Sequence, residues 1–67
     1  MFRYEVGTKI LIRHRNWDQT GSAIEVEILE KAPRRIKARI LSEGWFTVGK
    51  IYWLSDRDWF SVGRSRY

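Results

Sequence analysis

The chain contains no cysteine, a single histidine and a single proline among its 67 residues. Without cysteine there can be no disulfide, no thiolate metal ligand and no cysteine nucleophile. One histidine is also too few for the usual structural zinc sites. No apolar run approaches the ~20 residues that a membrane-spanning helix needs, and the first residues lack the apolar stretch of a signal peptide. We therefore expect one small domain, without metal or cofactor, whose default compartment is the cytoplasm.

Positive charge and tryptophan are what the sequence has in excess. It carries 13 Lys and Arg against 8 Asp and Glu, a formal net charge of +5, and 4 tryptophans. A guanidinium group binds phosphate through two hydrogen bonds and stacks on bases. Exposed aromatic rings also stack on unpaired bases. The composition therefore fits a nucleic-acid partner, and a merely solvated basic surface is the simpler alternative.

Two segments alternate strictly between apolar and charged side chains. Residues 24–28 interleave two glutamates with Ile and Val, and residues 35–40 interleave Arg and Lys with Ile and Ala. A period of two predicts half-buried strands. Pro33 lies between the segments, where it suits a turn and not a central strand. The pattern predicts an antiparallel hairpin with one apolar face.

The register of this hairpin depends on the length of its loop. A three-residue loop at residues 31–33 places Glu27 opposite Lys37. The same loop places Glu25 opposite Arg39, so the outer face is largely charge-compensated. A five-residue loop shifts every pair by two residues and leaves both faces unchanged.

Other short strands are predicted from β-branched and aromatic runs between turn residues, at residues 9–13, 45–48, 51–54 and 59–62. Ser55 resembles the N-cap of a one-turn helix at residues 55–58. The end of the chain, residues 63–67, reads as a flexible basic tail.

So many short strands in so short a chain favour a sheet that curls to hide its apolar side. The order and lengths of the strands resemble the Src-homology-type small barrel shared by Tudor and KOW domains. Residues 7–12, the loop to Gly21, the hairpin and residues 45–54 carry this resemblance. It implies an all-β fold, a five-stranded antiparallel barrel. The oligonucleotide-binding fold is the nearest alternative, but it usually has a longer chain and a helix between strands.

Few residues suit catalysis. His14 is the only imidazole and lies at the end of a strand, where a hydrogen-bonded structural role is the more common one. Asp56 and Asp58 could bind Mg²⁺, but two aspartates around Arg57 are more simply a cap and turn with a local ion pair. No phosphate-binding loop or serine-nucleophile elbow is present. We therefore expect no enzymatic activity.

Alternation separates the tryptophans from their aromatic neighbours. In residues 45–48 and 59–62 a phenylalanine and a valine share one face, which leaves Trp45 and Trp59 on the other. Trp17 lies in a polar loop after two arginines. For any single tryptophan, partial burial or a contact between copies is the alternative. Together, three exposed indoles would form a stacking surface.

These observations lead to a hypothesis of non-catalytic nucleic-acid binding, to DNA or RNA, in which arginines hold phosphates and indoles stack on bases. A protein-interaction module, such as an adaptor or a small virus-encoded inhibitor, could present the same residues to an acidic protein surface. Self-association through the aromatic face is compatible with both. The candidate site residues are Arg13, Arg15, Trp17, Arg35, Trp45, Arg57 and Trp59.

Overall fold

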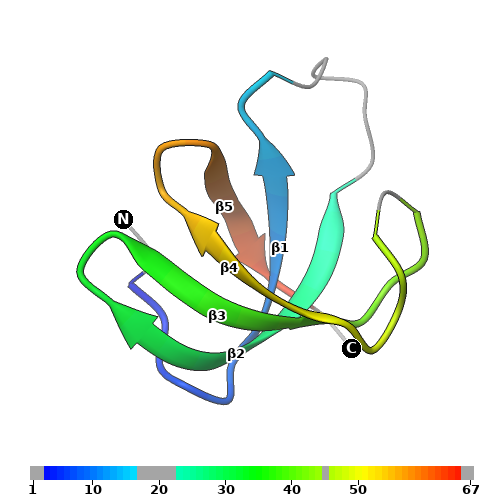
Figure 1. Ribbon diagram of the computed structural model, residues 1–67, viewed down its shortest axis with the longest axis horizontal. Coiled ribbons are helices and arrows are strands. Elements are labelled where there is room, and N and C mark those ends of the chain that lie inside the picture. The colour runs from blue at the N-terminus through cyan, green and yellow to red at the C-terminus, as the bar shows by residue number, and fades with distance from the viewer. Residues whose placement is uncertain (1–2, 17–22, 45, 66–67) are drawn as a thin grey trace.

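Five antiparallel strands make up the structure, a computed structural model that describes residues 3–16, 23–44 and 46–65. They form one sheet in the order β4-β3-β2-β1-β5 (Figure 1). This confirms the all-β, antiparallel prediction. The described residues contain no helix, and therefore none that could cross a membrane. The strands are β1 (Lys9–His14), β2 (Ile24–Ala32), β3 (Arg35–Ile40), β4 (Ile51–Ser55) and β5 (Trp59–Arg64).

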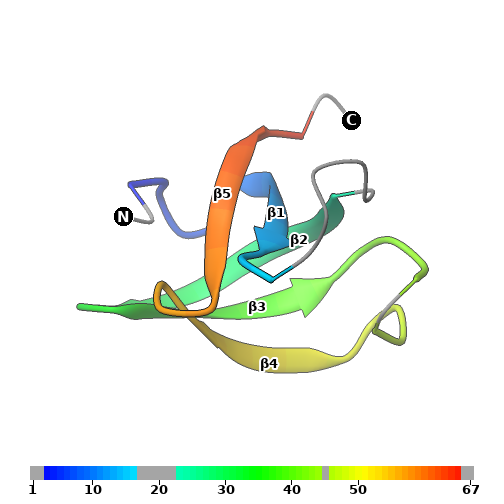
Figure 2. The ribbon, with the colours of Figure 1, turned by 90° about the horizontal axis from the view of Figure 1, so that it is seen from above.

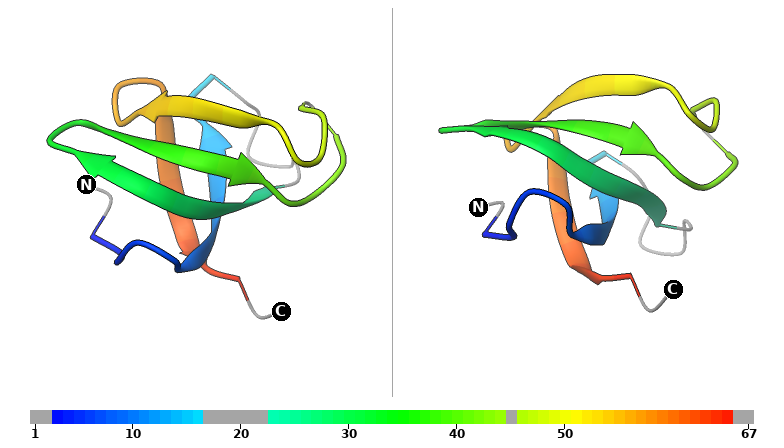
Figure 3. Two further views of the ribbon diagram at one scale, coloured as in Figure 1. Left: turned by 60° about the horizontal axis from the view of Figure 1, so that its bottom comes forward. Right: turned by 90° about the horizontal axis from the view of Figure 1, so that it is seen from below.

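The two edges of the sheet are consecutive in the sequence. β4 and β5 lie at opposite ends of the strand order, yet only residues 56–58 separate them. The sheet curls to allow this, so that β5 runs across β3 and β4 instead of beside them (Figures 2 and 3). No pairing between β4 and β5 occurs in the described strands. The sheet is therefore open, and the expected closed barrel is not confirmed.

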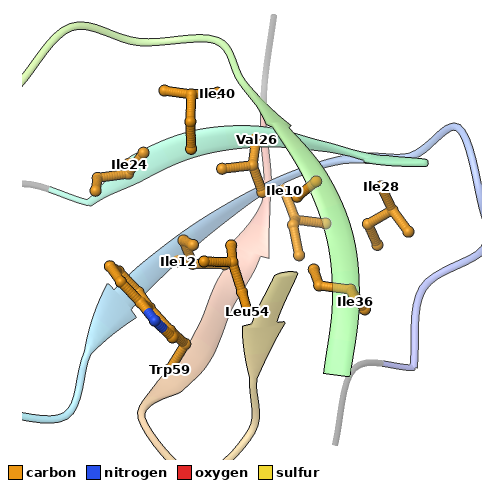
Figure 4. Close-up of a cluster of buried hydrophobic side chains, with 10 residues drawn as sticks. Ile10, Ile12, Ile24, Val26, Ile28, Ile36, Ile40, Leu54 and Trp59 are labelled. Carbon is orange, nitrogen blue, oxygen red and sulfur yellow. The ribbon is translucent and has the colours of Figure 1, made fainter. Parts of the chain in front are cut away.

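The core lies inside this curl and follows the period-two pattern. Alternate residues of β1, β2 and β3 point inward, because successive side chains of a strand lie on opposite faces. Full burial of one such aliphatic side chain stabilises the fold by about 1.5–3 kcal/mol. Figure 4 shows nine of the buried side chains labelled; among the described residues the buried hydrophobic side chains are Ile10, Ile12, Ile24, Val26, Ile28, Ile36, Ala38, Ile40, Leu54 and Trp59.

The hairpin of β2 and β3 has the predicted faces but not the three-residue-loop register. Ile28 lies opposite Ala38, which is the pairing of the five-residue alternative. This pairing does not come from a five-residue loop. Pro33 and Arg34 form a two-residue turn, and Leu29 is an extra residue in β2. A bulge of this kind takes up one residue and bends the strand. The alternating pattern predicts the faces, and it does not reveal where a bulge occurs.

Two predicted elements take other forms. The described part of residues 45–48 is not a strand but belongs to the link between β3 and β4, where Gly49 has φ +88° and its N–H donates to the carbonyl of Ile40 at 2.8 Å. The left-handed φ reverses the chain there. The one-turn helix at residues 55–58 is not confirmed either. Residues 56–58 form a turn, and the Ser55 hydroxyl donates to the Asp58 carboxylate at 3.3 Å.

The expected exposure of Trp59 is wrong, because this side chain is only 6% exposed. β5 pairs with β1 so that Trp59 lies opposite His14 and faces the core. The His14 ring meets the indole edge-on, at 4.9 Å between ring centroids, and Phe46 lies at 5.6 Å. Val62, assigned to the opposite face of the same strand, is 51% exposed. Trp59 and Val62 therefore lie on opposite faces of the strand, as predicted, but it is Trp59 that faces the core and Val62 that faces outward.

β5 also extends further than predicted. Gly63 and Arg64 pair with Leu11 and Ile10, and the Ser65 N–H donates to the carbonyl of Lys9 at 2.9 Å. Three residues assigned to the tail are thus hydrogen-bonded or paired to β1. Residues 66–67 of that tail lie outside the described residues.

Candidate functional site

The outer face of β3 and β4 gathers basic and aromatic side chains. Because Ile36 pairs with the buried Leu54, the residues between the inward positions of both strands point away from the core. On β3 these residues are basic, and on β4 they are apolar or hydroxylic. We call this set the β3–β4 outer face; it comprises Arg35, Lys37, Arg39, Ile51, Trp53 and Ser55.

On this face Arg35, the first residue of β3, lies over Trp53. The guanidinium carbon is 4.6 Å from the centroid of the indole, and the tryptophan is 47% exposed. Such a contact contributes about 0.5–1 kcal/mol at an exposed site. It holds the planar donor group against the ring while much of the indole stays accessible to a ligand.

The other two cations of this face are compensated. Lys37 Nζ lies 3.1 Å from a carboxylate oxygen of Glu30, and Arg39 Nη1 lies 3.5 Å from one of Glu27. Both pairs bridge β2 and β3 on the exposed side of the sheet, where each contributes only a few tenths of a kcal/mol. Within the described chain Arg35 forms no ion pair. Its charge is thus the least neutralised of the three.

More arginines surround the turn that joins β4 to β5. The Arg15 guanidinium donates to the carbonyl of Asp56 through Nε at 3.2 Å and Nη2 at 2.9 Å. The Asp56 N–H in turn donates to the carbonyl of Arg34 at 2.8 Å. Arg57 is exposed within the same turn. Hydrogen bonds to the backbone of Asp56 therefore hold three chain segments together here, and Arg35 begins the strand that follows Arg34.

A second arginine–aromatic contact lies on the β5 side of this turn. The Arg15 guanidinium carbon is 5.8 Å from the ring centroid of Phe60. Phe60 is half-buried and lies opposite Arg13 in the pairing of β1 with β5. Arg13 is itself half-buried. Each of the two strands that the turn joins thus carries an aromatic side chain in contact with an arginine, Trp53 on β4 and Phe60 on β5.

The structure brings together four of the seven predicted residues in one region or next to it. Arg15, Arg35 and Arg57 surround the β4–β5 turn, and Arg13 lies on the neighbouring part of β1. Trp59 is buried and presents no surface for stacking. Trp17 and Trp45 lie outside the described residues.

Trp53 is the residue that the sequence interpretation missed. It is the exposed indole of the described chain, and its neighbours Ile51 and Tyr52 are 46% and 37% exposed. The available signal was the alternation of residues 51–54. Once Leu54 is assigned to the core, Trp53 must point outward.

Catalytic features are few in the described part of the chain. It contains no pocket and no group of three or more metal-ligating side chains. His14 is half-buried, and its Nδ1 accepts a hydrogen bond from the Asn16 N–H at 3.1 Å. This is the hydrogen-bonded strand-end position expected from the sequence.

Neither a protein-family model, nor a curated protein, nor a solved structure matches the chain. A function is therefore inferred from the geometry and chemistry of the chain itself.

Proposed function

We propose that this protein is a non-catalytic nucleic-acid-binding domain that contacts single strands of DNA or RNA. The observation that carries the proposal is the stack of Arg35 on the half-exposed Trp53. An accessible indole can stack on an unpaired base, and an adjacent guanidinium can bind the phosphate beside that base. The chain's net charge of +5 favours a polyanion.

The proposed fold is a small barrel of the Src-homology type. It is supported by the strand order, in which the two edge strands are joined by a three-residue turn that draws the ends of the curled sheet together. The turn contains Arg57 of the proposed site and lies between two aromatic residues. Trp53 precedes it on β4, and Phe60 follows it on β5.

In the proposed complex, the strand runs past the β4–β5 turn. A base stacks on Trp53, Arg35 binds its phosphate, and Arg15 and Arg57 provide further phosphate contacts. Arg13 is half-buried, so its contribution to phosphate binding is smaller. Single strands are favoured over duplexes because only an unpaired base has its face free to stack on the exposed Trp53 ring.

Titration of fluorescently labelled single-stranded oligonucleotides tests the proposal. We expect affinity to fall steeply with salt, because each phosphate contact releases counterions. Trp53→Ala should weaken binding by about 5-fold to 100-fold, the usual loss of one base stack. Absence of binding to any DNA or RNA strand at micromolar protein and low salt would overturn the proposal.

Arg35→Gln and Arg39→Gln form a matched pair that separates a defined site from bulk charge. Both arginines lie on β3, face outward and lose one charge, but Arg39 already pairs with Glu27. Arg35→Gln should reduce the slope of log K against log salt by about 0.7, and Arg39→Gln should change it less. Equal slopes would mean that net charge alone attracts the strand.

A protein partner is the second candidate, and it is favoured by the exposure of Ile51 and Trp53 side by side on the β3–β4 outer face. Tryptophan, tyrosine and arginine dominate the energetics of protein interfaces. A pull-down from nuclease-treated lysate distinguishes the two functions. Partners that survive nuclease favour an acidic protein surface, and partners that are lost with the nucleic acid favour the first proposal.

A further inference from the structure

The two edges of the sheet differ in how they are protected against pairing with another strand. Natural edge strands are usually blunted by charged residues, proline or bulges. β5 carries Arg64, and the shift in its register against β1 leaves Val62 as an extra residue. β4 has neither device: Ile51–Ser55 is uncharged, and its register against β3 is unbroken.

Within the part of the chain that the structure describes, the backbone of β4 also leaves hydrogen-bonding groups available. In an antiparallel ladder, alternate residues direct their N–H and C=O groups toward the neighbouring strand. The bonds that flank β4 join Asp56 to Arg34 and Lys50 to Ile40, so the even-numbered positions face β3. Ile51, Trp53 and Ser55 therefore direct their backbone groups toward the open edge of the sheet.

From this edge we infer that the chain forms a symmetric dimer in which β4 pairs antiparallel with β4 of a second copy, centred on Trp53. This register places the available groups of Ile51 opposite those of Ser55 in the other copy, and Trp53 opposite Trp53. It also places Lys50 opposite Asp56 at both ends of the paired strands. In an antiparallel pair of identical strands, each Lys50 meets an Asp56. This match in charge favours a second copy of the chain over an unrelated partner.

The same register keeps inward and outward faces aligned. Tyr52, which faces inward beside Phe46 at 4.5 Å between ring centroids, lies opposite the buried Leu54 of the other copy. The exposed Trp53 side chains meet on the outer face. The two β3–β4 outer faces then join across the symmetry axis, each with an Arg35 over its indole.

The dimer is expected to be weak. Pairing one five-residue strand buries far less than the ~1,200–2,000 Å² of a stable interface. Sedimentation equilibrium in the absence of nucleic acid, from about 10 µM to about 1 mM protein, covers the range of weak association. We expect a monomer–dimer equilibrium in this range. A strictly monomeric chain at the highest concentration would overturn the inference.

Ile51→Lys and Val62→Lys identify the edge that is used. Both replace an exposed β-branched residue of an edge strand, 46% and 51% exposed, and both add one charge. Ile51→Lys should raise the dissociation constant of the dimer at least tenfold, while Val62→Lys should leave it unchanged. Equal effects, or a larger effect of Val62→Lys, would contradict pairing through β4.

Charge reversal tests the register. Lys50→Asp or Asp56→Lys alone places like charges opposite each other at both ends and should weaken the dimer about threefold to tenfold. The double variant restores opposite charges and should regain wild-type association. Failure of this rescue in a variant with wild-type thermal stability would exclude the register.

The dimer and the proposed function share Trp53, but the charge-reversal test of the dimer does not depend on that function. Lys50 and Asp56 are not among the proposed ligand-binding residues, and the double variant keeps the net charge. Loss of oligonucleotide binding with an intact dimer would count against the function alone, and the reverse result would count against the dimer alone.

Discussion

Trp53 and Trp59 have the same side chain and opposite surroundings. Trp59 packs between His14 and Phe46 at the margin of the core and is 6% exposed. Trp53 is 47% exposed, with Arg35 over its ring. Since one indole supports the fold and the other is available to a ligand, their removal should have different consequences.

We predict that Trp59→Ala lowers the free energy of unfolding by about 3–5 kcal/mol, as truncation of a buried aromatic residue does. Trp53→Ala should cost less than about 1 kcal/mol, because it removes an exposed ring and one cation–π contact. Urea denaturation of both variants measures the difference. Equal losses would mean that Trp53 also supports the core, and its assignment to the site would have to be withdrawn.

The two tryptophans also show what a pattern of residues can predict. Alternation correctly separated Trp59 from Phe60, but a period of two does not say which face is inward. That choice depends on the pairing of β5 with β1, which places Trp59 opposite His14. Such pairing is long-range, and no local signal in residues 59–62 specifies it.

At the level of elements, the hairpin of β2 and β3 is the part of the fold that the sequence predicts most fully. Its strands, apolar face and turn at Pro33 follow from alternation and from proline's restricted geometry. The bulge at Leu29 could not be predicted, because either register buries the same apolar residues. The bulge decides which charges meet across the strands.

A double-mutant cycle on these charges measures the register in solution. We predict a coupling free energy of about 0.2–1 kcal/mol between Glu30 and Lys37, whose charged atoms lie 3.1 Å apart. Glu25 and Arg39 should show none, because Arg39 lies opposite Glu27 and pairs with it, while the Glu25 carboxylate accepts a hydrogen bond from the Ser65 hydroxyl. A measurable coupling free energy between Glu25 and Arg39 would instead indicate the three-residue-loop register, in which these two residues lie opposite each other.

At the level of the whole molecule, the candidate site is composite. Its members come from β1 and the residue after it, from β3, β4 and the β4–β5 turn. Composition could therefore predict an excess of arginine and tryptophan, but not where these side chains come together. The curl of the sheet creates that meeting place. A ligand that contacts several of these segments at once should therefore stabilise the folded chain as a whole.

We predict that a single-stranded oligonucleotide at low salt raises the melting temperature. A ligand at about 100 times its dissociation constant adds about 2.7 kcal/mol to the stability of the state that binds it. In a domain of this size that corresponds to a shift of about 10–20 °C. Differential scanning fluorimetry or calorimetry with increasing oligonucleotide measures the shift, which should decline as salt is added.

Inorganic polyphosphate of matched charge is the control for this prediction, because it offers phosphates without bases. It should raise the melting temperature less than the oligonucleotide does. Trp53→Ala should remove most of the difference between the two polyanions, since base stacking on an indole is the contribution that only the oligonucleotide can make. Equal shifts in melting temperature with both polyanions would show that the arginines bind any polyanion and that no base stacks on Trp53.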